Sequence, residues 1–198
     1  MSLDRYLEVQ IDANTIEKLR KKAKEKIKTE GWALKGRDAD LKADNFARCW
    51  TSEIAWGSIL KQRNIKGQWA GLYVGNAEQA PPNYFMWFEG VKKTVGIRSR
   101  DIRALTRWEE VPYPNDRVRL EPEKIHDVTI VSSISFATKG ATVRFYGAID
   151  KEQFLPILQR TYRKLSRAQQ EYFRPVPLEH FSFELMLDLL KKADKIES

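Results

Sequence analysis

The sequence is poor in the residues that form covalent cross-links and transition-metal sites. It contains one cysteine, Cys49, and two histidines, His126 and His180. A single cysteine cannot form a disulfide within the chain, and one thiol with two imidazoles is too few ligands for a zinc cluster. We therefore expect neither a disulfide framework nor a zinc site, and we interpret Cys49 as a structural thiol in a helix.

Long apolar runs are also absent. The longest falls far short of the roughly 20 residues that a membrane-spanning helix needs, and the first residues, Met1 to Arg5, begin a charged segment without a signal-peptide core. An intracellular, cytoplasmic protein that does not contact a membrane is expected. Repeats, low-complexity tracts and long linkers are missing too, so one domain over residues 1–198 is predicted.

The motifs of several enzyme classes do not occur. No glycine-rich loop has nucleotide-binding spacing, and no Gly-x-Ser-x-Gly nucleophile elbow is present. Adjacent Glu109 and Glu110 are a poor acid and base pair, because neighbouring side chains usually point apart. Positive charge, in contrast, is plentiful: 35 lysines and arginines against 27 acids give a net charge of +8. This charge favours polyanionic partners, of which nucleic acid is the leading candidate.

Two helices are predicted in the first third of the chain. Residues 14–29, with Asn14 as N-cap, form a basic amphipathic helix that extends the domain at its N-terminus. Its lysines are either a phosphate-binding face or a solvated face, and the solvated face is the simpler interpretation. Residues 43–63 form a second helix that is apolar over more than half of its circumference and is therefore expected to be buried.

Glu53 lies within the apolar stripe of this second helix, between Trp50 and Gly57. A carboxylate in such a stripe loses hydration free energy on burial unless it is paired or takes part in a functional site. The alternative is a glutamate at the edge of the stripe that reaches solvent. Periodicity alone leaves both interpretations open.

Short apolar runs bounded by turn residues follow and are predicted to be strands. They cover residues 70–74, 84–88, 91–98, 128–136 and 142–149. The segment 101–124 is expected to be mostly irregular after a short helix. Helices are predicted after Asp150, which forms a capping box with Gln153, and over residues 182–193. This order indicates an α/β fold with a central mixed sheet of about five strands flanked by helices.

The hairpin formed by residues 84–98 carries the candidate site. Because side chains alternate along a strand, Gly96 and Arg98 lie on the same face. Asn83 stands at the start of the preceding strand, where hairpin pairing brings it close to the end that carries these two residues. Three positions on two strands are thus expected to converge, as they do in a metal-dependent nuclease.

At these positions the chain resembles the restriction-endonuclease-like, or PD-(D/E)XK, superfamily. Its motif is a Pro-Asp, a hairpin, and then an acid, any residue and a lysine. Pro82-Asn83 occupies the place of the Pro-Asp, Gly96 that of the second acid and Arg98 that of the lysine. Glu53 matches a helix glutamate that often precedes the hairpin in this family. The resemblance covers residues 43–190 and implies a restriction-endonuclease-like fold.

The departures from the motif bear on activity. The resemblance implies that two acids hold a divalent metal and that the lysine stabilises the nucleophile. Asn83 is neutral, Gly96 has no side chain and Arg98 is a fixed cation, so only Glu53 remains of the expected set. We therefore expect a catalytically inactive nuclease-like protein without a cofactor.

Three hypotheses about function follow. The first is a protein that binds DNA, or is a subunit of a DNA-processing assembly, through basic residues at and after the hairpin. These residues are Lys92, Lys93, Arg98, Arg100, Arg103 and Arg107. The second is an active, Mg²⁺-dependent endonuclease whose ligands have moved to Glu89 or Asp101, although both fit surface salt bridges better. The third is a structural or protein-interaction role in a virus or mobile element. The sequence leaves open a homodimer, and also whether the target is DNA or RNA.

Overall fold

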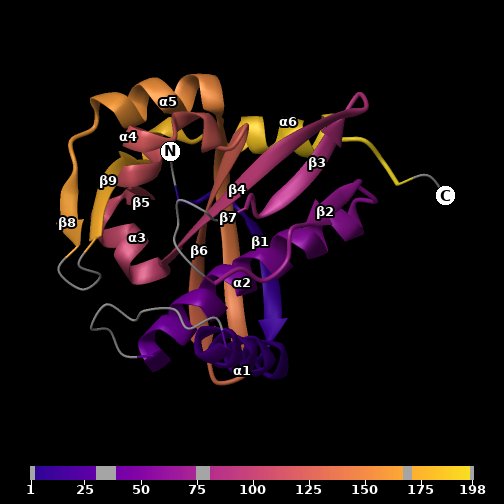
Figure 1. Cartoon of the computed structure of the whole chain (residues 1–198). Coiled ribbons are helices and arrows are strands. Elements are labelled where there is room, and N and C mark those ends of the chain that lie inside the picture. Colours follow the sequence, from indigo (N-terminus) through magenta and orange to yellow (C-terminus); the bar gives the residue numbers. More distant parts are fainter. Residues whose placement is uncertain (1–2, 30–38, 75–80, 167–170, 197–198) are drawn as a thin grey trace.

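The computed structural model describes residues 3–29, 39–74, 81–166 and 171–196. A mixed sheet of six strands forms its centre (Figure 1). In spatial order, these strands are β1 (Leu7–Asp12), β7 (Gly140–Asp150), β6 (Val128–Ala137), β4 (Val91–Asp101), β3 (Tyr84–Phe88) and β2 (Gly67–Trp69). A second sheet contains β5 (Glu110–Pro114), β9 (Glu171–Pro177) and β8 (Lys164–Ser166).

Six α-helices accompany the two sheets in the described part of the chain. They are α1 (Ala13–Thr29), α2 (Ala39–Gln62), α3 (Ile102–Trp108), α4 (Asn115–Leu120), α5 (Lys151–Arg160) and α6 (Phe183–Lys192). Short 3₁₀ turns, η1 (Pro122–Lys124) and η2 (Leu178–His180), complete the order. In the central sheet, β4 and β6 are parallel and every other neighbouring pair is antiparallel.

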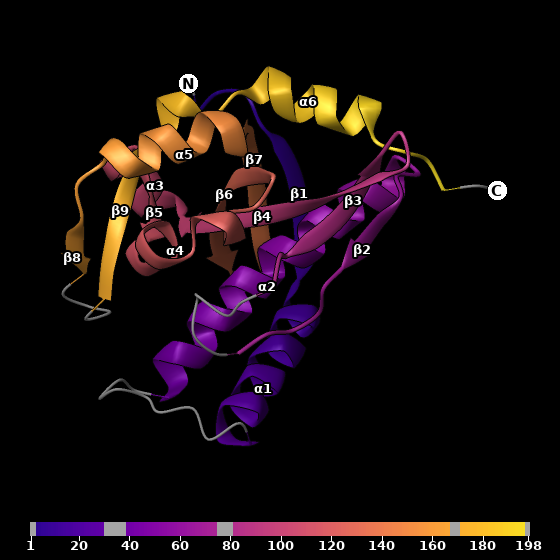
Figure 2. The ribbon, with the colours of Figure 1, turned by 45° about the horizontal axis from the view of Figure 1, so that its top comes forward.

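Apolar side chains on the two faces of the central sheet form separate cores. On one face, Val95 and Ile97 of β4 pack in a cluster that includes Trp56 of α2 and Leu190 of α6. The opposite face contributes Val131 and other residues to a second cluster, which contains side chains from α5, β5 and β9. The turned ribbon view shows α2 and the second sheet on different sides of the molecule (Figure 2). A third cluster joins α1 to α2.

The α/β class and the mixed central sheet are confirmed, and several details of the prediction are wrong. No strand forms at residues 70–74. The strand on the side of β3 away from β4 is instead β2, which ends just before this segment. Segment 101–124 is more ordered than expected, because it contains α3, β5 and α4. The edge strand β1 and the second sheet were not predicted.

The N-cap of α1 also differs from the prediction. The helix begins at Ala13, and Asp12 accepts a hydrogen bond from the backbone N–H of Thr15 at 2.8 Å. Asn14 therefore lies inside the first turn. The predicted cap at Asp150 is confirmed, because its carboxylate accepts from the N–H of Gln153 at 2.9 Å. Among the described residues, no helix is long and apolar enough to cross a membrane.

Candidate functional site

Glu53 is a buried acid on α2, with only 5% of its surface exposed. Both of its carboxylate oxygens accept short hydrogen bonds. Trp69 Nε1 donates to Oε2 at 2.6 Å, and Asn83 Nδ2 donates to Oε1 at 2.6 Å. The backbone carbonyl of Glu53 accepts from the hydroxyl of Tyr84 at 3.0 Å. Of the two interpretations that the sequence left open, the structure therefore favours the buried and paired carboxylate.

Asn83 joins this acid to β4. Its Oδ1 accepts from the backbone N–H of Ile97 at 2.6 Å, while its Nδ2 donates to Glu53. One amide thus serves as acceptor for the strand and donor for the acid, a combination that an ionised aspartate cannot provide. Asn83 thus lies beside the 96–98 segment of β4, as hairpin pairing predicts, and Glu53, which only the resemblance associated with these residues, is hydrogen-bonded to it.

Gly96 is buried, and a side chain at this position has no room. A Cβ atom built there would lie 2.1 Å from Cδ2 of His126, far inside van der Waals contact. His126 is itself only 5% exposed. The space that a second acid would need is therefore filled by an imidazole ring from the segment just before β6.

Arg98 lies on the same face of β4 as Gly96, as strand parity predicts. Its guanidinium carbon stands 4.6 Å from the centre of the Tyr113 ring. Within the described part of the chain, the buried Nε of Arg98 and the hydroxyl of Tyr113 have no hydrogen-bond partner. The positive charge of Arg98 also lowers the pKa of Glu53, so the two side chains interact electrostatically.

Burial dominates the acidity of Glu53. Desolvation raises its pKa to about 7, although hydrogen bonds from Trp69 and Asn83 and the charge of Arg98 act in the opposite direction. Near neutral pH the carboxyl group is therefore divided between its neutral and ionised forms.

Folding stability is expected to fall as the pH rises between the unfolded and folded pKa values of Glu53. An acid with a raised pKa binds its proton more tightly in the folded chain, so the native state holds more protons than the unfolded state in this range. From the ordinary value of 4.5 to about 7, the loss amounts to at most about 3 kcal/mol. Urea unfolding of the wild type and of Glu53→Gln, measured from about pH 4.5 to about pH 8, tests this.

The quantity to compare is the slope of unfolding free energy against pH. Glu53→Gln introduces an amide that faces a donor, so its absolute stability changes at every pH, whereas its slope loses the Glu53 contribution. Glu89→Gln removes one exposed carboxylate from the β3–β4 turn and is the matched control with which the slope of Glu53→Gln is compared. An identical slope in Glu53→Gln and the wild type contradicts the raised pKa.

The two acids suggested as relocated metal ligands, Asp101 and Glu89, lie at a helix cap and in a turn. Asp101 caps α3 by accepting from the N–H of Arg103 at 3.0 Å. Glu89 occupies the β3–β4 turn with a φ of 51°. Among residues 3–29, 39–74, 81–166 and 171–196, no group of three or more His, Cys, Asp or Glu side chains is placed to hold a metal ion.

The six basic residues proposed to bind nucleic acid do not form one cluster. Lys92 and Lys93 are exposed at the start of β4, and Arg103 and Arg107 are exposed on α3, roughly 30 Å away along the strand. Arg98 and Arg100 lie between them and are half-buried. The guanidinium of Arg100 donates to the backbone carbonyl of Glu110, and burial lowers its pKa. The four exposed residues are thus better placed to reach a phosphate.

Helix α1 is a second basic surface. Two ion pairs attach it to α2: Arg20 with Asp44 at 3.0 Å and Lys24 with Asp40 at 2.8 Å. A hollow of about 330 Å³ is lined by residues of α1: Thr15, Lys18, Leu19, Lys21, Lys22 and Glu25. Lys18, Lys21 and Lys22 are exposed beside this hollow.

Another hollow, of about 340 Å³, lies beside the second sheet. Its lining includes exposed Trp108 and three acids, Glu109, Glu110 and Glu179. Carboxylates repel phosphate, and neither Glu53 nor the hairpin lines this hollow. It is therefore separate from the candidate site.

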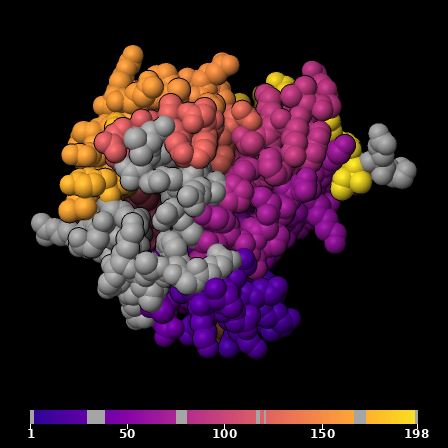
Figure 3. Space-filling view, viewed as in Figure 1, coloured from indigo at the N-terminus to yellow at the C-terminus, as the bar shows by residue number. Residues whose placement is uncertain are grey.

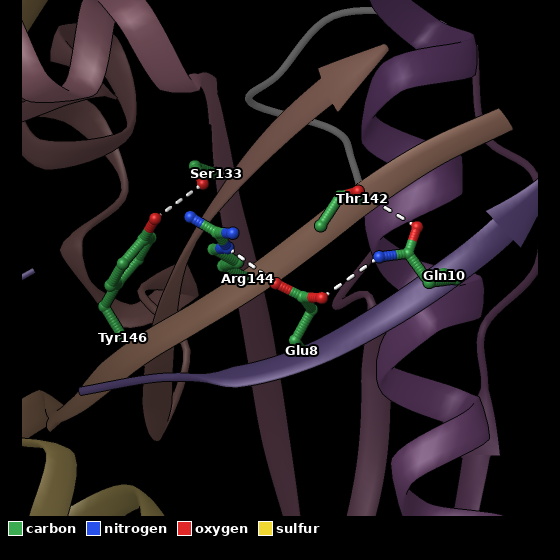
Figure 4. Close-up of polar contacts among 6 residues, drawn as sticks. All are labelled: Glu8, Gln10, Ser133, Thr142, Arg144 and Tyr146. Atoms are coloured by element: carbon green, nitrogen blue, oxygen red, sulfur yellow. Dashed lines mark hydrogen bonds and ion pairs between the residues drawn. The ribbon is translucent and has the colours of Figure 1, made fainter. Parts of the chain in front are cut away.

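A polar network on β1, β6 and β7 was not predicted (Figure 4). Glu8 accepts from Arg144 Nε at 2.8 Å and from Gln10 Nε2 at 3.0 Å, and Thr142 donates to Gln10 at 2.9 Å. The alternation of polar and apolar residues in Leu7–Asp12 is the signal that could have identified the strand. Because these groups satisfy one another, the network is best explained as stabilising the pairing of edge strand β1 with β7.

Comparison with known proteins gives no relative from which a role could be transferred. No family model matches the chain, and no curated protein and no solved structure matches it either. The resemblance to restriction-endonuclease-like proteins stays a prediction from the residues of the hairpin and of α2.

Proposed function

We propose that this protein is a catalytically inactive, nuclease-like protein that binds nucleic acid, most simply DNA, alone or within a DNA-processing assembly. The observation that carries the proposal is the hydrogen bond from Asn83 to Glu53. The resemblance implies acids that share a metal at this place. Here the amide of Asn83 donates instead to the one remaining acid, Glu53. The space for a further acid at Gly96 is occupied by His126.

Charge supports the binding part of the proposal. The net charge is +8, and lysine and arginine side chains release counterions when they contact phosphates. Lys92, Lys93, Arg103 and Arg107 are exposed along β4 and α3. Replacement of acids by Asn83 and Gly96 also removes negative charge that would repel a phosphate backbone.

Binding should weaken when these four cations are replaced together by alanine. Each lost phosphate contact reduces the slope of log K against log salt concentration by up to about 0.9, so the loss should be largest at low salt. Fluorescence anisotropy with labelled DNA, measured over a salt series, gives both the affinity and the slope.

A matched control removes the same charge from α1. Lys18, Lys21, Lys22 and Lys28 are exposed, and their replacement by alanine lowers the net charge from +8 to +4, as the first variant does. We expect a smaller effect from this control. An equal loss in both variants contradicts a site at β4 and α3, because the attraction would then depend on total charge alone.

A further inference from the structure

The outer face of the β3–β4 hairpin carries aromatic rings. Tyr84 and Met86 of β3 point into the core with Val95. Phe85, which lies between them, and Trp87, which follows Met86, therefore point to the opposite face. Both rings are half-buried. Strands β3 and β4 form part of the surface in the space-filling view, at the upper right in magenta (Figure 3).

Two exposed lysines lie over these rings. Lys92 pairs with Trp87 across the hairpin, and its Nζ stands 3.8 Å from the centre of the Phe85 ring and 5.6 Å from that of Trp87. Lys66, next to β2, places its Nζ 5.2 Å from the centre of the Trp87 ring. Rings and cations therefore occupy one face of three adjacent chain segments.

From this arrangement we infer that Phe85, Trp87, Lys66 and Lys92, here named the aromatic platform, bind single-stranded nucleic acid by stacking bases on the rings. The inference rests on the proposed function and specifies the class of nucleic acid and the place where it binds. Aromatic side chains on an open sheet face stack bases of any sequence, and nearby lysines contact the phosphates.

The spacing of the rings favours a single strand. Residues two apart on a strand are separated by about 7 Å, whereas stacked bases of a duplex are about 3.4 Å apart. Phe85 and Trp87 thus match successive bases of an extended strand whose own stacking is broken. A duplex keeps its base faces covered and offers only phosphates to Lys66 and Lys92.

The platform has a defined border on β4. Thr94 lies in the row next to Lys92 and opposite Phe85, and both its N–H and its hydroxyl donate to Asp127, at 2.7 and 2.8 Å. The Asp127 carboxylate accepts these two hydrogen bonds, and its negative charge repels a phosphate on the side of Thr94 away from β3. The bound strand should therefore run along β3, over Phe85 and Trp87, and not cross β4 towards Asp127.

The first test compares three DNA probes of about 12 nucleotides. They are single-stranded thymidine DNA, a duplex, and an abasic strand that has the same phosphates but no bases. Anisotropy titration at low salt should show the thymidine strand bound at least about tenfold more tightly than the abasic strand. A uridine strand distinguishes RNA from DNA as the source of the bases, and either one supports the platform if it outperforms its abasic counterpart.

The second test replaces both rings with smaller apolar side chains. Phe85→Leu with Trp87→Leu should weaken single-strand binding at least about tenfold and leave duplex binding nearly unchanged. The matched control is Trp108→Leu, because Trp108 is 54% exposed and has Arg107 at 5.0 Å from its ring centre. Thermal unfolding confirms that each variant is folded.

The outcomes separate the two proposals. Equal binding of thymidine and abasic strands, or unchanged single-strand binding in the double leucine variant, overturns the platform. Duplex binding that survives in that case leaves the proposed function intact. Failure of every nucleic acid to bind at low salt overturns both proposals.

Discussion

Replacing Gly96 with alanine is expected to reduce the free energy of unfolding by about 2 kcal/mol or more. Alanine normally stabilises a strand position relative to glycine, because glycine loses more backbone freedom on folding. Here its Cβ would lie 2.1 Å from the His126 ring, and both residues are buried. Chemical denaturation of the wild type and the variant measures the difference directly.

A double-mutant cycle assigns the cause of this loss. His126→Ala removes the ring that fills the space above Gly96, so the alanine at 96 should cost far less in that background. The coupling free energy between the two changes should be at least about 1 kcal/mol. If Gly96→Ala is equally destabilising with and without the imidazole, the contact does not explain the glycine.

Asn83→Asp is the second change with a large expected effect. The aspartate can still accept from the N–H of Ile97, but it loses the N–H donor and places a carboxylate against Glu53. Loss of a buried hydrogen bond and repulsion between like charges should together cost about 3 kcal/mol at pH 8. The cost should shrink below pH 7, because Glu53, whose pKa is about 7, is then protonated.

Divalent cations and a surface control sharpen this test. Mn²⁺ should raise the unfolding midpoint of Asn83→Asp but not that of the wild type, because only the variant places two carboxylates together. Asn14→Asp makes the same chemical change at an exposed position in the first turn of α1. It should alter stability by less than about 0.5 kcal/mol. Equal effects at positions 83 and 14 contradict the role assigned to Asn83.

Strand alternation and hairpin pairing were sufficient to predict that Asn83 approaches the end of β4, whereas only the family resemblance associated Glu53 with these residues. The apolar stripe of α2 identified Glu53 as an acid in an unusual environment, and strand alternation brought Asn83 near the end of β4. Both inferences depend on repeats of a few residues, which the sequence displays directly. The structure adds that the two side chains are hydrogen-bonded at 2.6 Å.

Local patterns could not predict the residues from other segments that contact the site and the hairpin, namely His126, Trp69 and Lys66. His126 reaches Gly96 because β6 runs parallel to β4 after a long crossover, and no local repeat encodes that pairing. Trp69 was assigned to no predicted strand, because the strand was predicted at residues 70–74 and β2 ends at this tryptophan. Similarly, Lys66 approaches Trp87 only through the pairing of β2 with β3.

One measurement tests the central claim that the protein binds nucleic acid without cutting it. Purified protein is mixed at low salt with end-labelled single-stranded and duplex DNA, with Mg²⁺ or Mn²⁺ present, and retention and fragment length are read from the same samples. The account predicts that the DNA is bound and remains intact. Metal-dependent cleavage that disappears in Glu53→Ala, or the absence of any binding, would contradict it.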